Sequence, residues 1–185
     1  MRRIYVQPVG PVDPEMIEAI GQRIFETFDC ETVVRPVIEV PEGSYEKERQ
    51  QFSSSVVLQH LVGICPGDAY RMLGVTQCDL FIPMLSFVFG QAQLNGRVAL
   101  LSLSRLHQEF YGLPEDRPVW RERTLKETLH ELGHTFGLIH CLEKECPMAL
   151  STTIQLLDRK GSEYCRSCLL MLREAMRMGA SGVEL

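Results

Sequence analysis

The sequence predicts an α+β domain with α/β-like alternation: a mixed, mostly parallel, twisted sheet with helices packed against it. The chain has 185 residues, enough to bury a hydrophobic core without disulfide staples. Its hydrophobic fraction of 45% is ordinary for a globular protein. Strand-like and helix-like runs alternate along it, which indicates helices layered on a sheet. We therefore expect a single domain over residues 1–185.

The N-terminal elements begin with a short strand at residues 4–7, which we expect to end before Pro8. A helix then begins at Asp13 and Pro14, because aspartate caps a helix and proline suits its first turn. Apolar residues follow at helical spacing: Ile17, Ile20, Ile24 and Phe28. A β-rich run at residues 32–40 contains a proline, which favours an edge or bulged strand.

The middle of the chain continues the alternation. Residues 51–63 form an amphipathic helical pattern, and the mostly apolar run at residues 78–85 is typical of a central strand. Two further strand-like runs, at residues 86–94 and 97–103, flank an Asn-Gly pair at 95–96. Asn-Gly between two such runs is the strongest short signal for a β-hairpin.

A helix that begins near Pro118 carries the main chemical motif. Its apolar positions recur at i, i+4, i+7 and i+11 and predict one buried stripe: Leu125, Leu129, Leu132 and Phe136. Further on, residues 152–160 look helical, and a last helix opens at residues 165–168. Its plausible apolar face consists of Leu169, Leu172, Ala175 and Met176. Residues 179–185 are expected to form a frayed tail.

The motif is HExxHxxGxxH, from His130 to His140. Histidines four residues apart share one helix face, so the His130 and His134 rings can reach one zinc ion. Gly137 permits a sharp turn at the helix end, since glycine adopts the left-handed conformation readily, and this turn swings His140 back as a third ligand. Glu131 is placed to act as general base on a water molecule. Three protein ligands and one open position indicate a catalytic zinc.

Four cysteines follow the motif at metal-ligand spacing: Cys141, Cys146, Cys165 and Cys168. Four thiolates favour a closed, structural zinc site, although two disulfides or free thiols are alternatives. Since Cys141 directly follows His140, a closed zinc there would anchor the turn that delivers the third histidine. The other three cysteines, which are scattered, are expected to be small buried hydrophobic residues: Cys30, Cys65 and Cys78.

The histidine motif, the methionine that follows it in Cys146-Pro147-Met148, and the four cysteines together resemble the archaemetzincins. The resemblance implies a metzincin-type fold with an active-site helix and a small C-terminal helical lobe that carries the four-cysteine zinc. It divides the domain into an N-terminal subdomain (residues 1–137) and a C-terminal one (residues 138–185). It makes Met148 an apolar floor under the histidines, and residues 86–94 an edge strand that pairs with substrate.

We therefore expect a zinc-dependent metallopeptidase with two zinc ions per chain, one catalytic and one structural, and Glu131 as the base. Two other functions stay open: a non-enzymatic or latent peptide-binding module that retains the zinc site, and a metal-dependent ribonuclease with the same three-histidine spacing. An accidental HExxH on a core helix is a further alternative. His60 and His107 lie outside the motif and are not expected to be ligands.

The expected partner is a peptide or protein substrate, with no nucleic acid and no membrane. The formal charge of −5 argues against a polyanionic partner. Residues 1–8 lack the apolar stretch of a secretion signal, and no run has transmembrane length. The total of seven cysteines is odd, and four of them have metal-ligand spacing, which favours a reducing compartment. We expect a cytoplasmic protein that is a monomer.

Overall fold

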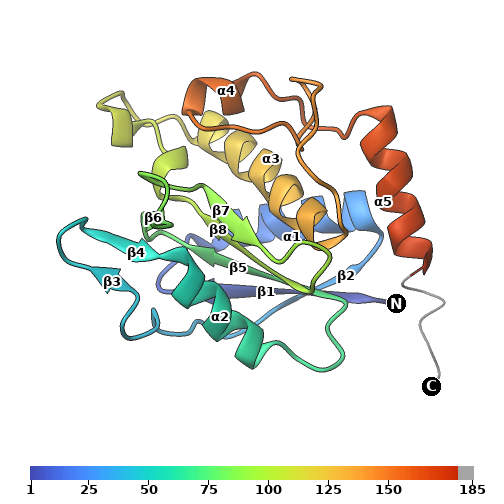
Figure 1. Ribbon diagram of the computed structural model, residues 1–185, viewed down its shortest axis with the longest axis horizontal. Coiled ribbons are helices and arrows are strands. Elements are labelled where there is room, and N and C mark those ends of the chain that lie inside the picture. The colour runs from blue at the N-terminus through green and yellow to red at the C-terminus, as the bar shows by residue number, and fades with distance from the viewer. Residues whose placement is uncertain (179–185) are drawn as a thin grey trace.

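A five-stranded sheet forms the centre of the computed structural model, which describes residues 1–178 (Figure 1). The strands lie in the order β2-β1-β5-β8-β7. Their bounds are Arg3–Val9 (β1), Glu31–Val34 (β2), Arg71–Thr76 (β5), Gly90–Ala92 (β7) and Val98–Ser102 (β8). β2, β1, β5 and β8 are parallel, and β7 pairs antiparallel with β8 at one edge. The expected mixed, mostly parallel sheet is thus confirmed.

The helices lie on both faces of this sheet. They are α1 (Pro14–Phe28), α2 (Ser54–Ile64), α3 (Arg117–Thr135), α4 (Ile154–Asp158) and α5 (Arg166–Met178). A small second sheet, ordered β3-β4-β6, consists of Tyr45–Glu46 (β3), Gln51–Ser53 (β4) and Leu80–Phe81 (β6). Two short 3-10 turns, Ser104–Leu106 and Glu109–Tyr111, lead into α3.

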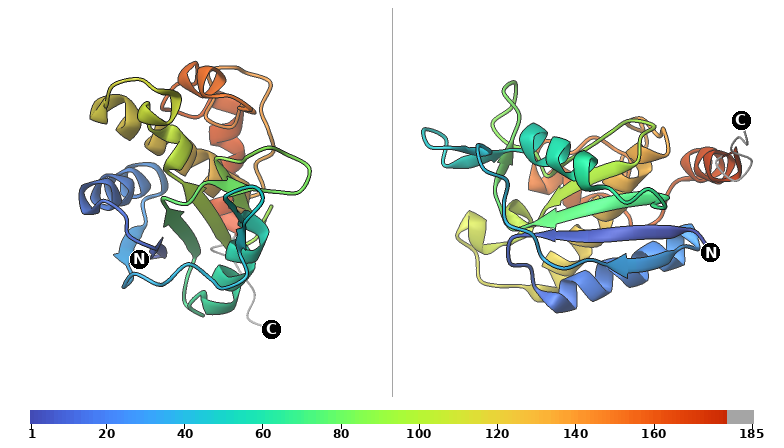
Figure 2. Two further views of the ribbon diagram at one scale, coloured as in Figure 1. Left: turned by 90° about the vertical axis from the view of Figure 1, so that its left-hand side faces the viewer. Right: turned by 90° about the horizontal axis from the view of Figure 1, so that it is seen from below.

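Alternate residues of the parallel strands face two separate hydrophobic cores. Leu73 and Leu101 belong to the core built with α1 and α3, whereas Met72 and Leu100 belong to the core built with α2. This alternation follows from the two-residue period of a strand. Figure 2 shows α1 and α2 on opposite sides of the sheet. α3 therefore lies on a packed layer, which gives its histidines a rigid support.

The first helix and the hairpin match the expectations. Asp13 caps α1 by accepting a hydrogen bond from the Glu15 N–H at 2.9 Å. β7 and β8 form the expected antiparallel hairpin, and Asn95 in its turn has a positive φ of 53°. The β-rich run that contains a proline supplies only β2, which is an edge strand as expected.

The first strand is longer than expected: β1 continues through Pro8 to Val9. Proline normally interrupts a ladder because it lacks an N–H. Here β2 has already ended at Val34, and the Gln7 side chain donates to the Pro36 carbonyl at 2.7 Å. Since Pro8 has no backbone N–H to donate, the Pro36 carbonyl accepts from the Gln7 side chain instead.

The expected central strand at residues 78–85 is wrong. The central position belongs to β5, while the apolar run contributes only Leu80–Phe81 to the small sheet. Pro83 lies two residues after the end of β6 and lacks a backbone N–H donor. β5 is inconspicuous in the sequence because it begins with Arg71 and contains Gly74. The helical pattern over residues 51–63 is also shorter than expected, since its first three residues pair as β4.

In the C-terminal part, α4 and α5 confirm the two helices expected there, with Leu172 buried and Leu169 partly buried. The tail at residues 179–185 lies outside the described residues. Within residues 1–178, no helix is both long and apolar enough to cross a lipid bilayer.

Gly74 provides a test of how tightly α2 packs on the sheet. A methyl group there would overlap the Leu61 side chain and lie 3.2 Å from Leu100 Cδ1, and both leucines are fully buried. We expect Gly74→Ala to lower the free energy of unfolding by about 1–3 kcal/mol through overpacking, measured by urea denaturation. The control is Gly67→Ala, where the added methyl meets open space and the change should stay within about 0.5 kcal/mol.

Candidate metal centres and cleft

The third helix presents the motif and then stops sharply. Asp116 caps its start by accepting from the Val119 N–H at 3.0 Å. At the other end, Gly137 has a φ of 86° and donates its N–H to the His134 carbonyl. This left-handed residue turns the chain back toward the helix, as the sequence predicted. Phe136 stacks on Phe28 at 5.4 Å and holds the turn to the core.

The turn brings the three histidines together. Each ring offers one nitrogen to a common point, and these three nitrogens lie within 4.8 Å of one another. The Nε2 atoms of His130 and His134 are 3.2 Å apart, close to the edge of about 3.3 Å for a tetrahedron with Zn–N bonds of about 2.05 Å. The His140 ring centroid lies 5.4 Å from that of His130 and 5.0 Å from that of His134.

Hydrogen bonds fix the protonation pattern of two of these rings. His130 Nδ1 lies 2.8 Å from the Pro147 carbonyl, and His134 Nδ1 lies 2.7 Å from the Leu138 carbonyl. A carbonyl only accepts, so each Nδ1 must carry a proton, and each neutral ring then has a lone pair on Nε2. Two lone pairs that face each other at 3.2 Å cannot bond to each other. A cation between them resolves the conflict, so the residues fit a metal ion.

The electrostatics favour neutral, ligand-ready rings. Burial lowers the pKa of His130 well below its ordinary value, and the Lys160 charge lowers it further. Burial also lowers the pKa of His134 and His140. All three imidazoles are therefore neutral at neutral pH, which is the form that binds a metal.

Glu131 lies beside the histidines under the sheet edge. It is 4% exposed, and burial raises its pKa well above the ordinary value, with the nearby Glu127 charge as the next cause. A Cβ at Gly90 would lie 2.5 Å from Glu131 Oε1. Because Gly90 has no side chain, it leaves space for this carboxylate. No sequence pattern indicated this role.

A second glycine, Gly133, allows a close contact on the inner side of α3. A Cβ at Gly133 would lie 2.5 Å from Met148 Sδ and 3.2 Å from the Tyr164 hydroxyl. Met148 is fully buried, and the Tyr164 hydroxyl donates to the Leu129 carbonyl at 2.6 Å. The methionine therefore packs directly against the backbone of the motif helix.

The four cysteines form a second cluster. Their sulfur atoms lie within 4.8 Å of one another, and Cys141 Sγ and Cys165 Sγ are 3.8 Å apart. That distance matches the edge of about 3.8 Å for a tetrahedron with Zn–S bonds of about 2.3 Å. All seven cysteines of the chain lie in the described residues and are free thiols, so the disulfide alternative is wrong. Burial raises the pKa of the Cys146 and Cys168 thiols, so their ionised forms require a compensating cation.

The turn that contains Pro147 joins the two clusters. Cys146 supplies a thiol, the next carbonyl accepts from His130, and the Met148 carbonyl accepts from the Cys141 N–H at 2.9 Å. A backbone bond from Ala149 N to the Cys146 carbonyl closes it. The histidine and cysteine clusters are therefore held by one short segment.

A cleft of about 470 Å³ lies over the histidines. β7 forms one wall, and the segments after α3 form the other. Exposed apolar side chains line its rim: Leu85, Leu94, Ile139 and Leu150. The backbone groups of Phe89 and Gln93 bond to β8. Residues alternate in an antiparallel pair, so Gly90 and Ala92 direct their N–H and C=O groups to the open edge.

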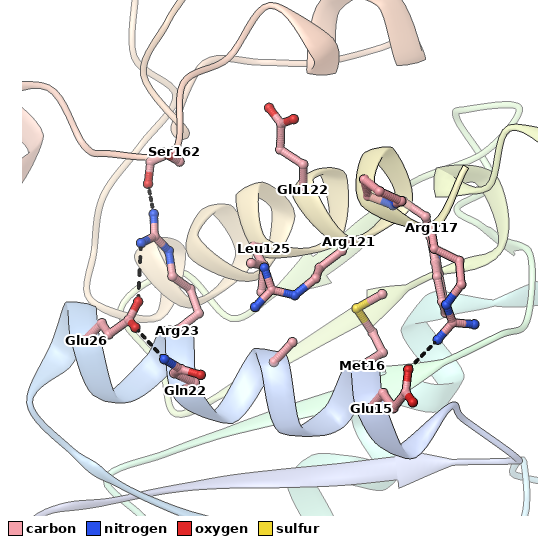
Figure 3. Close-up of a pocket in the computed structure, with 13 residues that line it drawn as sticks. Glu15, Met16, Gln22, Arg23, Glu26, Arg117, Arg121, Glu122, Leu125 and Ser162 are labelled. Atoms are coloured by element: carbon pink, nitrogen blue, oxygen red, sulfur yellow. Dashed lines mark hydrogen bonds and ion pairs between the residues drawn. The ribbon is translucent and has the colours of Figure 1, made fainter. Parts of the chain in front are cut away.

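A larger hollow of about 710 Å³ between α1 and α3 has a different character. Figure 3 shows Arg23 bonded to Glu26 and Ser162, and Arg117 bonded to Glu15. Its lining shares no residue with the cleft over the histidines. The charges at its two ends are thus paired within the walls, and its size does not make it the active site.

The remaining candidate residues are spread over the fold. His107 stacks on Trp120 at 4.1 Å, and His60 lies exposed on α2. Cys30 is buried as expected, whereas Cys65 and Cys78 are only partly buried. Of the predicted apolar stripe on α3, the last three members are buried and Leu125 is partly buried.

Two histidines and a glutamate on a helix, joined by a third histidine after its terminal turn and lying below an open sheet edge, define the class of zinc metallopeptidases. Comparisons with known proteins agree. Residues 28–174 match the model of Peptidase family M54. An archaemetzincin from Methanocaldococcus jannaschii is 43% identical over 173 residues, which is 93% of each chain.

Solved structures give the same result. The crystal structure of archaemetzincin from Methanopyrus kandleri matches with a TM-score of 0.85 and 33% identity, over 95% of this chain and 96% of that one. That of archaemetzincin from Archaeoglobus fulgidus, complexed with malonate, matches with a TM-score of 0.79 and 34% identity, over 91% and 99%. The chain belongs to peptidase family M54, the archaemetzincins, and is a zinc metallopeptidase.

The contact between Gly133 and Met148 can be tested by a single methyl group. Alanine normally stabilises a helix by roughly 1 kcal/mol relative to glycine, yet at Gly133 the methyl would collide with the Met148 sulfur. We expect Gly133→Ala to lower the free energy of unfolding of the zinc-loaded protein by about 1–3 kcal/mol. Gly63→Ala, at an open helical position, should raise it. A stabilised Gly133→Ala protein would contradict the tight packing.

Proposed function

We propose that this chain hydrolyses peptide bonds at a zinc held by His130, His134 and His140, with Glu131 as the general base. The observation that carries the proposal is the pair of Nε2 lone pairs 3.2 Å apart, oriented by bonds from each Nδ1 to a carbonyl. Bound there, zinc would polarise the scissile carbonyl as a Lewis acid and acidify a water molecule.

Glu131 performs the proton transfers in this mechanism. Its raised pKa makes the carboxylate a competent acceptor for the proton of the attacking water. The same carboxyl group then passes the proton to the nitrogen of the leaving amine, so it ends the cycle in its starting form. Gly90 keeps the space beside it open, so the carboxylate reaches the cleft although it is almost fully buried.

The edge strand β7 holds the substrate. An extended peptide adds as a further strand when backbone groups face an open edge, and Gly90 and Ala92 supply such groups. The exposed leucine and isoleucine side chains on the cleft rim then contact substrate side chains. This places the scissile bond over the histidines with backbone hydrogen bonds that do not depend on sequence.

We propose a second, structural zinc bound by Cys141, Cys146, Cys165 and Cys168, which makes two zinc ions per chain. The distance of 3.8 Å between Cys141 Sγ and Cys165 Sγ, with all four sulfur atoms within 4.8 Å of one another, supports it. The chain then divides into an N-terminal subdomain that ends at residue 137 and a C-terminal subdomain from residue 138 that carries this site. Free thiols and the absence of disulfides among the described residues support a reducing compartment such as the cytoplasm, where we propose that the chain is a monomer. The acidic balance supports the absence of a nucleic-acid partner.

Replacement of Glu131 tests the mechanism. We expect Glu131→Ala to retain zinc at the histidines and to lose hydrolysis by at least about 100-fold, because the base contributes roughly 10²–10⁴ in rate. Metal analysis and cleavage profiling on a peptide library measure the two quantities. Glu18→Ala, an exposed change on α1, is the control. Full activity in Glu131→Ala would eliminate this residue as the base.

Removal of one thiol tests the link between the metal sites. We expect Cys165→Ser to lower zinc occupancy at both sites, because the turn that contains Cys146 and bonds to the Cys141 N–H also supports the His130 ring. Zinc content per chain and the affinity at the histidines are measured by competition with a chelator. Cys65→Ser, outside the cluster, should leave both sites filled. Normal histidine-site affinity in a protein with an empty cysteine site would remove the coupling.

A further inference from the structure

Lys160 is a buried charge that the mechanism does not use. Its side chain has no exposed surface. The ammonium donates to Glu127 Oε1 at 2.8 Å and lies 3.4 Å from His130 Nδ1. A lysine is rarely buried so fully unless it is paired, and here the pair lies against a histidine of the metal site.

Its partner, Glu127, lies one helical turn before Glu131 and lines the cleft. It is 2% exposed, and the ligand-capable atoms of Glu127, His130 and Glu131 lie within 4.8 Å of one another. Without a fixed partner, this carboxylate would be free to hydrogen-bond to His130 or to repel the carboxylate of Glu131. The bond to Lys160 gives it one orientation.

Two other links already fasten the same segment to α3. Arg123 pairs with Asp158 through two bonds of 2.7 Å, and the Lys126 ammonium lies 3.5 Å from the Asp158 carbonyl. The segment therefore has anchors that do not touch the histidines. A buried ion pair carries a desolvation penalty and often adds little stability, so attachment alone does not account for the third link.

We propose that Lys160 and Glu127 are positioning residues for the metal centre. The Lys160 ammonium holds the Glu127 carboxylate in one orientation, so that this carboxylate does not compete for the Nδ1 proton of His130. The ring then keeps its bond to the Pro147 carbonyl and aims Nε2 at the metal. This inference rests on the proposed function, since it takes His130 as a ligand. Lys160 acts through His130 and touches no reacting atom.

The test uses the full-length protein with cobalt(II) as the probe metal. Thiolate ligands add charge-transfer absorption that histidines lack, so the visible spectrum reports the two sites separately. The main variant is the double change Lys160→Met with Glu127→Gln, which removes both charges and leaves neither buried alone. Glu127→Gln by itself is the second variant, because its amide oxygen can still accept from Lys160.

Lys126→Met is the matched control. Lys126 is a second buried lysine, located on α3 itself, and it pairs with Glu122 at 2.6 Å. Its replacement removes a buried charge of the same kind without breaking the contact with His130. Circular dichroism and thermal melts show that each variant is folded before metal is added.

We expect the double variant to bind cobalt at the histidine site roughly 10–100-fold more weakly, as found when a partner of a metal-bound histidine is removed. The cysteine-site spectrum should be unchanged, kcat should fall and KM should stay constant. Glu127→Gln should show a smaller loss in the same direction, and Lys126→Met none at the histidines.

Wild-type affinity at the histidine site in both folded variants would overturn the positioning role. So would an equal loss in Lys126→Met, since the effect would then come from any buried charge. A failure of the proposed function looks different: the wild-type protein itself would bind no cobalt at the histidines.

Discussion

The turn from Cys146 to Ala149 is the constraint on which both clusters depend. Within these four residues the chain gives one thiol to the cysteine cluster, one carbonyl to the His130 ring, and one carbonyl to the Cys141 N–H. Backbone groups in a closed turn have few alternative orientations. A displacement of the turn therefore moves a sulfur atom, a histidine ring and the residue after the third histidine together, which makes the two proposed zinc sites one mechanical unit.

The active-site helix is held between two close contacts that depend on missing side chains. On one side Gly90 lets the sheet edge approach Glu131, and on the other Gly133 lets Met148 lie against the helix backbone. Each contact sets a distance that any Cβ would increase. Because interiors transmit strain at close packing, the helix can shift toward neither the sheet nor the turn, and its histidines are fixed with it.

Much of the site could be predicted from the sequence because its chemistry is local. His130 and His134 are four residues apart, which places them on one face of a helix, and Gly137 indicates a turn at the helix end. The central strand β5 could not be found in this way, since its Arg71 and Gly74 conceal a strand that is buried by tertiary pairing. Gly90 and Lys160 were missed for the same reason: each acts on a residue at least 30 positions away. The four-residue spacing of Glu127 and Glu131 placed both carboxylates on one helix face, but it did not indicate that Lys160 pairs with Glu127.

The two proposed zinc sites differ in what they contribute: a closed site contributes folding free energy, and an open site contributes catalysis. Four thiolates can leave a bound zinc with no open position, and such closed sites contribute on the order of 10 kcal/mol or more to folding. An open site must keep one position for water and substrate, so it has fewer ligands with which to hold its own geometry. The Cys141 N–H donates a hydrogen bond to the Met148 carbonyl. This bond links the cysteine cluster to the segment below the histidines and restricts the movement of that segment. A zinc bound at the cysteine cluster would thus stabilise the geometry that the proposed catalytic zinc, with three ligands, could not enforce alone.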